Sequence, residues 1–237
     1  MREIFTRTED NQIVRIEVNL EAKEYKELNP YILSVFIKYD ALNEKNDGLE
    51  EFFEIKESLI IALELDKTTA YVGNRLVGEW SEIYFYSQES KGLETKVAQI
   101  LKPTKYMNES NVVKDSQWEF FDYNIFPNDL ELCLMQSQKI VEHMQDEGDN
   151  IEISREVEHY ASFETPTQKQ RFVENAEQNG FTFKADIEDE DIKYGVALTK
   201  EHNLSEDDIK KTIMQIHEYI KQENGEYELW STTFKGD

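Results

Sequence analysis

The side chains that most often serve as nucleophiles, bases or metal ligands are few in this chain. Its 237 residues include one cysteine, Cys133, and four histidines, which are His143, His159, His202 and His217. No two of these histidines have the short spacing that brings two metal ligands together on one helix or loop. Cys133 lies on the apolar stripe of a predicted helix, which favours a buried thiol over a reactive one. We therefore predict neither a metal centre nor thiol catalysis.

Motifs for other catalytic or cofactor chemistry are missing as well. The chain contains no G-x-S-x-G, no G-x-G-x-x-G and no Walker motif. His159 alternates in phase with Val157 and Ala161 along a predicted strand, which favours a buried structural histidine over a base or a ligand. The run DIEDED at 186–191 lacks the glycine and the distal glutamate of a calcium loop and fits a solvated hairpin tip better. We predict no catalytic residue and no bound cofactor, so the chain is not expected to be an enzyme.

The charge of the chain excludes two classes of partner. Aspartate and glutamate outnumber lysine and arginine by 50 to 26, which gives a formal net charge of -24 at pH 7. Binding to nucleic acid and to anionic membranes relies on basic surfaces, so we expect neither. The segment KYGVAL at 193–198 has the look of an RNA-binding strand, but its alternation places Tyr194 on the face that helices cover. Because no apolar signal core or long apolar span is present, we expect a cytoplasmic protein.

Apolar periodicity predicts a β-α-β-β-α-β order in the first part of the chain. The predicted strands cover 31–39, 69–77, 80–86 and 118–126, after an early strand at 13–18, and the predicted helices cover 49–65 and 93–101. A further helix starts at Asn128, which can cap it together with Glu131, and the run DEGDN closes it. We place the domain boundary after this helix, so that the first domain covers residues 1–147.

The same element order is predicted for residues 148–237. Strands are expected at 157–163, 181–187, 192–198 and 226–234, and capped helix starts at Thr165 and Ser205. The fold class is therefore α+β, with two tandem ferredoxin-like sandwiches joined by a helix. Residues up to Glu147 include 16 basic and 29 acidic side chains, and those after it include 10 and 21. Both halves are thus strongly acidic.

The uncovered face of the second sheet is the predicted contact surface. If His159 points inward, Tyr160 points outward from the same strand. In the last strand, strict alternation turns outward either Tyr227 with Leu229 or Trp230 with Phe234. We therefore take Tyr160, Tyr227 and Trp230 as candidate protein-contact residues, because exposed aromatics with an acidic rim suit a protein interface. The alternative is that this face packs on the first domain or on a second copy.

Several motifs of the second half resemble those of a known bacterial family. The segment GDNIEISREVEHYASF at 148–163 is similar to a G-D…R-x-V-[ED]-H…F junction, and NGF follows at 179–181. The closing GEYELW at 225–230 resembles the G-G-E-Y-D-G-W of the domain called regulator of ribonuclease E activity B. The first half resembles the uncharacterised domain that often precedes it, through YVGNR at 71–75, the aromatics at 84–86, and Trp118.

This resemblance implies a non-catalytic protein that binds an endoribonuclease and regulates RNA turnover. Together with the charge, it suggests a basic segment of an RNA-processing enzyme as the partner. A rival hypothesis is an enzyme or small-ligand binder with a pocket near Arg75, lined by Trp80 and the aromatics at 84–86. In the alternative to that pocket, these residues fill the core and Arg75 pairs with a carboxylate. A third hypothesis is an acidic mimic of nucleic acid.

Overall fold

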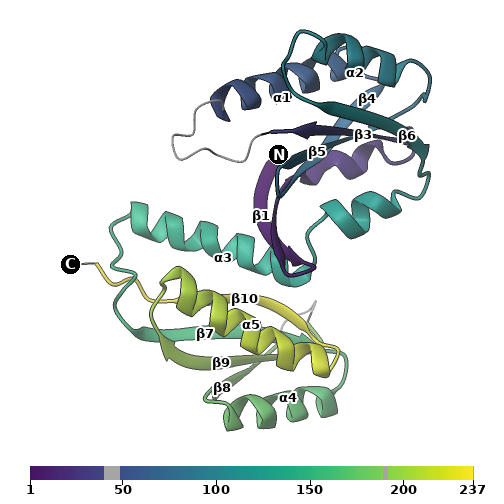
Figure 1. Ribbon diagram of the computed structural model, residues 1–237. Helices are drawn as coiled ribbons and strands as arrows, with labels where there is room; N and C mark the ends of the chain where they lie inside the picture. Colours follow the sequence, from purple (N-terminus) through teal and green to yellow (C-terminus); the bar gives the residue numbers. More distant parts are fainter. Residues whose placement is uncertain (40–48, 189–191, 237) are drawn as a thin grey trace. The chain divides into compact units, whose positions relative to one another are not determined.

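The protein folds into two compact α+β units, and the boundary between them along the chain falls between Pro127 and Asn128 (Figure 1). The structure, a computed structural model, describes residues 1–39, 49–188 and 192–236. Each unit has one antiparallel sheet, of six described strands in the first unit and four in the second. The predicted α+β class is confirmed. The tip of the DIEDED run, residues 189–191, lies outside the described part of the chain.

The six strands of the first sheet lie in the order β1-β2-β4-β5-β3-β6. They are β1 (Arg2–Glu9), β2 (Gln12–Asn19), β3 (Tyr31–Lys38), β4 (Thr69–Val77), β5 (Trp80–Ser87) and β6 (Asn108–Lys114). The helices are α1 (Leu49–Glu64) and α2 (Leu93–Leu101), with short helical turns at η1 (Leu20–Tyr25) and η2 (Phe121–Ile125). Strand β1 had no counterpart in the sequence prediction. It forms an antiparallel hairpin with β2. The two residues of the turn, Asp10 and Asn11, have φ angles of 47° and 62°, which suit a tight two-residue hairpin turn.

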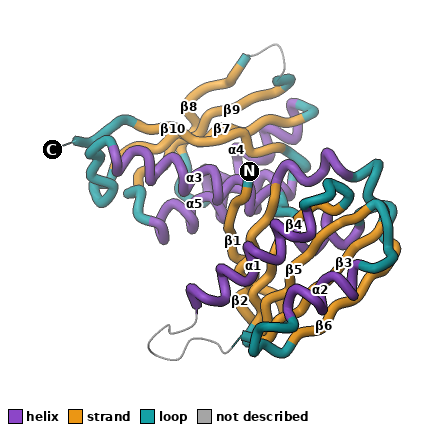
Figure 2. The backbone as a smooth tube through the Cα atoms, turned by 90° about the horizontal axis from the view of Figure 1, so that it is seen from above, coloured by secondary structure: helices purple, strands orange, loops and turns teal. Residues whose placement is uncertain are grey.

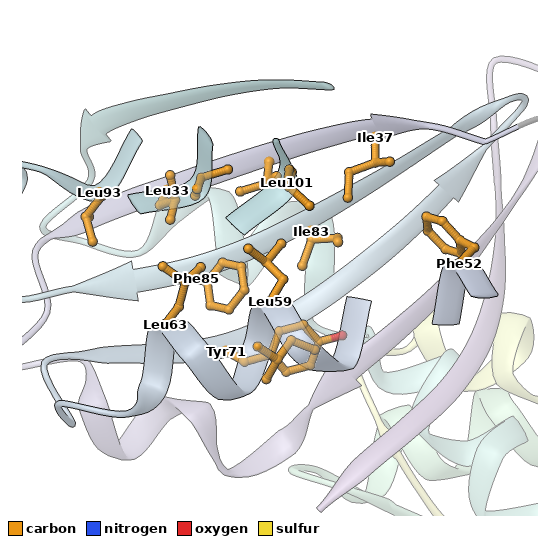
Figure 3. Packing of buried hydrophobic residues seen from close by; sticks show 13 residues of the cluster. Leu33, Ile37, Phe52, Leu59, Leu63, Tyr71, Ile83, Phe85, Leu93 and Leu101 are labelled. Carbon is orange, nitrogen blue, oxygen red and sulfur yellow. The ribbon is translucent and has the colours of Figure 1, made fainter. Parts of the chain in front are cut away.

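Two apolar layers cover the first sheet, one on each face. On one face, Leu59 and Leu63 of α1 pack with Leu33, Ile83 and Phe85 of the central strands (Figure 3). On the other face, the Trp118 ring stacks on the Tyr86 ring with centroids 3.9 Å apart. The Trp118 indole donates a hydrogen bond of 2.8 Å to the Asn29 carbonyl, so its polar atom is satisfied although the side chain is fully buried.

The predicted strand at 118–126 is wrong, and this segment is helical. Apolar residues are too frequent in this segment for a two-residue alternation to be told from helical spacing. The buried side chains, Trp118, Phe121 and Ile125, have helical spacing. The chain enters this turn at Trp118 with a φ of 58°. The last strand of this unit is instead β6, which lies in the stretch before Trp118 where no strand was predicted. As an edge strand it is largely exposed, which explains its polar sequence.

The second sheet has the order β10-β7-β9-β8. Its strands are β7 (Arg155–Phe163), β8 (Thr182–Ile187), β9 (Tyr194–His202) and β10 (Glu226–Thr232), and the helices of this unit are α3 (Asp129–Asp146), α4 (Pro166–Gln178) and α5 (Glu206–Gln222). The capping box of Asn128 with Glu131 forms as predicted. The Thr165 cap also forms as predicted, and so does the Ser205 cap. Gly180 ends α4 with a φ of 90°, a conformation that glycine adopts without strain.

Helix α3 belongs to the second unit by its packing, so the boundary predicted after residue 147 is corrected to Pro127. It runs beside α5 (Figure 2). Val141 of α3 is in one buried cluster with Ile213 of α5 and Trp230 of β10. The Trp230 indole also donates a hydrogen bond of 2.8 Å to Ser137 Oγ of α3. Periodicity showed that this helix has an apolar face, but it could not show which sheet that face would cover.

Candidate functional site

Strand β10 contains a bulge that turns two of the three candidate contact residues inward. Tyr227 lies opposite Ala161 of β7 and Trp230 lies opposite His159, with the irregularity between Tyr227 and Leu229. One extra residue lets positions 227 and 230 share the helix-covered face, which strict alternation forbids. The prediction that only one of the two would point inward is therefore corrected.

The two inward side chains make core contacts. Trp230 is only 3% exposed and packs against α3 and α5. The Tyr227 hydroxyl lies 2.8 Å from Nδ1 of His159, and the ring packs in the same interior. Of the three candidates, the sheet geometry leaves only Tyr160 on the face opposite to α4 and α5.

This opposite face, which we call the open face, is acidic. It carries Tyr160 at its centre, and its charged side chains are Glu156, Glu158, Lys184, Glu201 and Glu228. The Tyr160 hydroxyl lies 2.7 Å from Ser231 Oγ and donates to Glu158 over 3.1 Å. Lys184 pairs with Glu158 and holds the pKa of that carboxyl below its ordinary value. Among the described charges of this face, four carboxylates thus outnumber one ammonium group, which pairs with Glu156 and Glu158.

His159 is buried, as its alternation predicted, and is 1% exposed. Its ring lies 5.8 Å from the His202 ring, centroid to centroid. Burial lowers the pKa of His159 to about 3, and the neighbouring His202 and Lys200 add to the shift, so the imidazole is neutral in the fold. Cys133 is half-buried, and burial raises the pKa of its thiol, which opposes nucleophilic reactivity.

The Asp and Arg of the G-D…R motif form a buried ion pair with a structural role. Both side chains have no exposed surface, and Arg155 Nη1 lies 2.8 Å from the Asp149 carboxylate. The guanidinium also donates to the carbonyls of Asn150, Ile153 and Thr233. This pair therefore ties the loop after α3 to the chain beyond β10.

In the first unit, Arg75 is held by carboxylates. Its guanidinium pairs with Glu9 at 2.5 Å and with Glu82 at 3.4 Å, and the Tyr84 hydroxyl donates to Glu82 over 2.9 Å. Tyr86 is fully buried against Trp118. At Arg75 the structure thus shows the core-filling alternative, with the arginine paired to a carboxylate.

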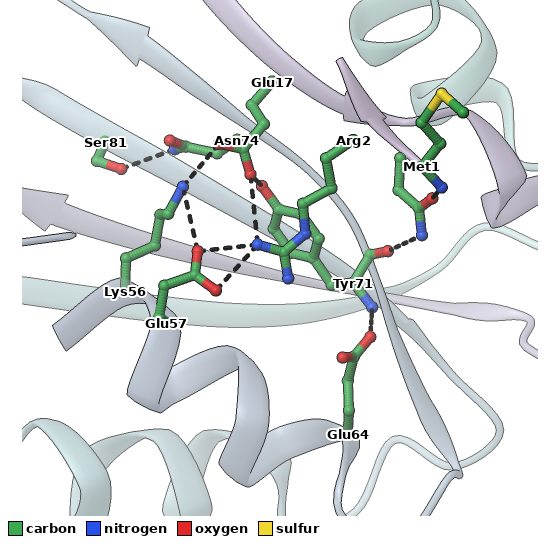
Figure 4. Close-up of polar contacts among 10 residues, drawn as sticks. Met1, Arg2, Glu17, Lys56, Glu57, Glu64, Tyr71, Asn74 and Ser81 are labelled. Carbon is green, nitrogen blue, oxygen red and sulfur yellow. Dashed lines mark hydrogen bonds and ion pairs between the residues drawn. The ribbon is translucent and has the colours of Figure 1, made fainter. Parts of the chain in front are cut away.

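A pocket of about 280 Å³ lies on the other face of β4, where α1 faces β2. Figure 4 shows the polar contacts of Glu17, Lys56, Glu57 and Asn74, which belong to its lining. It is lined by Ile4, Arg15, Glu17, Phe53, Lys56, Glu57, Asn74 and Leu76. The Lys56 side chain is 4% exposed, and its Nζ lies 2.8 Å from Glu17 Oε2. The Tyr71 hydroxyl donates to the other oxygen of Glu17 over 2.7 Å. Burial alone would raise the pKa of Glu17, but Lys56 and Tyr71 hold it below its ordinary value.

The position of Lys56 in α1 is a signal for this pocket in the sequence, and apolar periodicity alone does not reveal it. Lys56 stands four residues after Phe52 and three before Leu59, within the apolar stripe of α1. A lysine at such a position must either reach solvent or find a buried partner. The partner, Glu17, comes from a strand 39 residues earlier in the chain, so the pair could not be identified from the sequence.

The described part of the chain has neither a metal-binding cluster nor a membrane-spanning helix. Within residues 1–39, 49–188 and 192–236, no group of three or more His, Cys, Asp or Glu side chains is arranged to hold a metal ion. Over the same residues, no helix is both long and apolar enough to cross a membrane.

Comparison with known proteins finds a family for each half of the chain. The model described as "Family of unknown function (DUF695)" matches residues 3–124, and the model described as "Regulator of ribonuclease activity B" matches residues 134–232. The resemblance inferred from the motifs is confirmed for both halves. No curated protein matches the chain.

Two solved structures have a weak overlap with the whole chain. One is an unknown protein from Galdieria sulphuraria, with 7% identity, 86% of this chain and 99% of that chain covered, and a TM-score of 0.22. The other is a putative glycine cleavage system transcriptional repressor, with 7% identity, 89% and 99% covered, and a TM-score of 0.23. At such TM-scores neither likeness supports an inference about fold or function.

Proposed function

Because the chain belongs to the family of unknown function matched at residues 3–124 and carries a regulator of ribonuclease activity B domain at 134–232, we propose that it is a non-catalytic regulator that binds a ribonuclease. The single observation that carries this proposal is the match over the second unit. It spans most of α3 and all four strands of that sheet. A partner in RNA turnover implies that the protein acts in the cytoplasm.

We propose that the ribonuclease contacts the open face of the second sheet, centred on Tyr160. The acidic character of this face and the net charge of -24 favour a partner segment rich in lysine and arginine. Opposite charges speed the encounter of two proteins and align them before contact. Because Tyr227 and Trp230 point inward, Tyr160 is the remaining candidate for an aromatic anchor, and aromatic anchors often dominate the binding energy of an interface.

We further propose that both units are ferredoxin-like sandwiches. The strand order β10-β7-β9-β8, with helices after the first and third strands, supports this for the second unit. In the first unit, β3 to β6 have the corresponding order, and the β1–β2 hairpin adds two strands at one edge. The open face would then be the sheet face that this architecture leaves without helices.

A cleavage assay tests the proposed function. A purified endoribonuclease from the source organism is mixed with a labelled RNA, with and without the full chain. We expect the protein to slow or redirect cleavage, and calorimetry to detect direct binding that weakens between about 10 mM and about 150 mM salt. A chain that neither binds the endoribonucleases of its organism nor alters their cleavage would refute the proposal.

A surface variant tests the proposed contact face. Tyr160→Ala should weaken binding by about tenfold or more, which corresponds to about 1.4 kcal/mol. Tyr123→Ala is the matched control, because Tyr123 is a tyrosine with 79% exposure in the first unit. If both variants bind as tightly as the unaltered chain, the open face is not the contact surface, while the regulatory function itself stands.

A further inference from the structure

The pocket between α1 and β2 in the first unit is lined by both charged and apolar side chains. Each of its two carboxylates forms an ion pair with a cation in the network drawn in Figure 4. Glu17 is paired with Lys56 at 2.8 Å, and Glu57 accepts two hydrogen bonds from Arg2, of 2.8 and 3.0 Å. The Lys56–Glu17 pair is largely buried, and burying an ion pair is costly compared with packing apolar side chains in the same space. Arg2 and Glu57 are partly exposed.

One further cation lines the same pocket. Arg15 lies directly opposite Leu76 in the β2–β4 pairing, so it shares the pocket face with Glu17 and Asn74. Within residues 1–39, 49–188 and 192–236, no carboxylate lies within ion-pair distance of the Arg15 guanidinium. The lining holds two cations, Arg15 and Lys56, and two carboxylates, Glu17 and Glu57. Because Lys56 and the neighbouring Arg2 already pair with these carboxylates, Arg15 is, among the described residues, the lining cation without an ion pair. An arginine presents its donors in a planar fork that matches a carboxylate.

Apart from Asn74, the rest of the lining is apolar. Ile4 of β1, Phe53 of α1 and Leu76 of β4 form the walls beside the charged groups. A volume of about 280 Å³ is at the lower end of the range for ligand sites and holds roughly nine water volumes of about 30 Å³. It therefore suits a small metabolite. The occupant should combine one anionic head with a short apolar body.

We propose that this pocket binds a small organic carboxylate, with its carboxylate paired to Arg15 and its apolar body against Ile4, Phe53 and Leu76. The Lys56–Glu17 pair, fixed by the Tyr71 hydroxyl, supplies a rigid polar wall behind the head group. The first unit is then a ligand-sensing domain attached to the proposed regulator. The site is independent of the ribonuclease proposal, because all its residues lie in the first unit.

Titration of the full chain with hexanoate, followed by amide and methyl NMR shifts, tests this site. We expect shifts at Arg15, Leu76 and neighbouring strand residues, with a Kd of about 1 mM, as befits so small a ligand. Hexylammonium, which has the same apolar body and the opposite charge, should bind at least about tenfold more weakly. Inorganic phosphate should also bind more weakly, because it leaves the apolar walls uncovered.

Two variants locate the binding. Arg15→Gln should weaken hexanoate by about tenfold or more, and Leu76→Trp should abolish binding by filling the pocket. Arg171→Gln is the matched control, because Arg171 is an exposed arginine on α4. If Leu76→Trp does not fold, Arg15→Gln decides alone, since its side chain is at the surface. Equal affinity of hexylammonium, unchanged binding in Arg15→Gln, or no shift up to about 10 mM hexanoate each overturns the proposal.

Discussion

The buried ion pair of Asp149 and Arg155 leads to a testable prediction about the stability of the second unit. Replacing Arg155 by Met would leave the Asp149 carboxylate buried without its cation, because neither side chain has solvent-exposed surface. The carbonyls of Asn150, Ile153 and Thr233 would lose their guanidinium donors in the same step. Removal of one partner from a buried ion pair costs about 3–5 kcal/mol. We expect a loss of this size in the free energy of unfolding of the second unit.

Amide hydrogen exchange on the full chain measures this loss for each unit separately. The slowest amides of β7 and α5 report the opening of the second unit, and those of β3 and β5 report the first unit as an internal control. Arg155→Met should speed exchange in the second unit by a factor that corresponds to about 3 kcal/mol or more, and leave the first unit unchanged.

A double-mutant cycle separates the pair from its surroundings. Asp149→Leu and Arg155→Met together should cost less than the sum of the single variants, with a coupling of about 1–3 kcal/mol. The Asp149 carboxylate also accepts a 2.9 Å hydrogen bond from the Lys235 amide, so the double variant will not fully restore stability. A single-variant loss below about 1 kcal/mol, or zero coupling, would refute a structural role for this pair.

Three further predictions concern the interior of the second unit. Burial lowers the folded pKa of His159 to about 3, so between pH 6.5 and 3 only the unfolded chain gains its proton, and this residue should contribute a fall in stability of about 1.4 kcal/mol per pH unit. The pKa values of His202 and His217 are also lowered, so urea unfolding at pH 6.5 and 5 should show a loss that His159→Gln reduces, and an equal loss in that variant would contradict the role of His159. Ser137→Ala leaves the Trp230 indole without its acceptor and should cost about 1–3 kcal/mol by denaturant titration, while a cost below about 0.5 kcal/mol would argue against that bond. At Gly225 a Cβ would lie 2.3 Å from the Phe163 ring, so Gly225→Ala should lower stability by about 1–3 kcal/mol, whereas a thermal midpoint equal to that of the unaltered chain would contradict this contact.

Local signals predicted the second unit well. The capped starts at Asn128, Thr165 and Ser205 all form, because a cap depends on residues within one helical turn. The burial of His159 followed from two-residue alternation alone. The errors arose where several periods compete. The aromatic run after Trp118 reads as a strand, yet it folds as a helical turn because its buried rings fill the second face of the first sheet.

The candidate contact surface was only partly predictable for a specific reason. A bulge changes the phase of a strand, and nothing in the sequence of β10 marks one at Glu228 before its register against β7 is known. Tyr160, which lies on a regular strand, was placed correctly on the face opposite to His159. Tyr227 and Trp230 were not, because their phase depends on the partner strand.

The sequence by itself determined the α+β class, the order of most elements, the acidity of both halves and the family resemblance of each. These depend on composition, on local periodicity and on short motifs, which need no knowledge of distant contacts. Only the tertiary structure decided which sheet α3 covers, which face of β10 is open, and that Lys56 meets Glu17 beside Arg15. Each of these depends on residues far apart in the chain, whose pairing is fixed only when the sheets assemble.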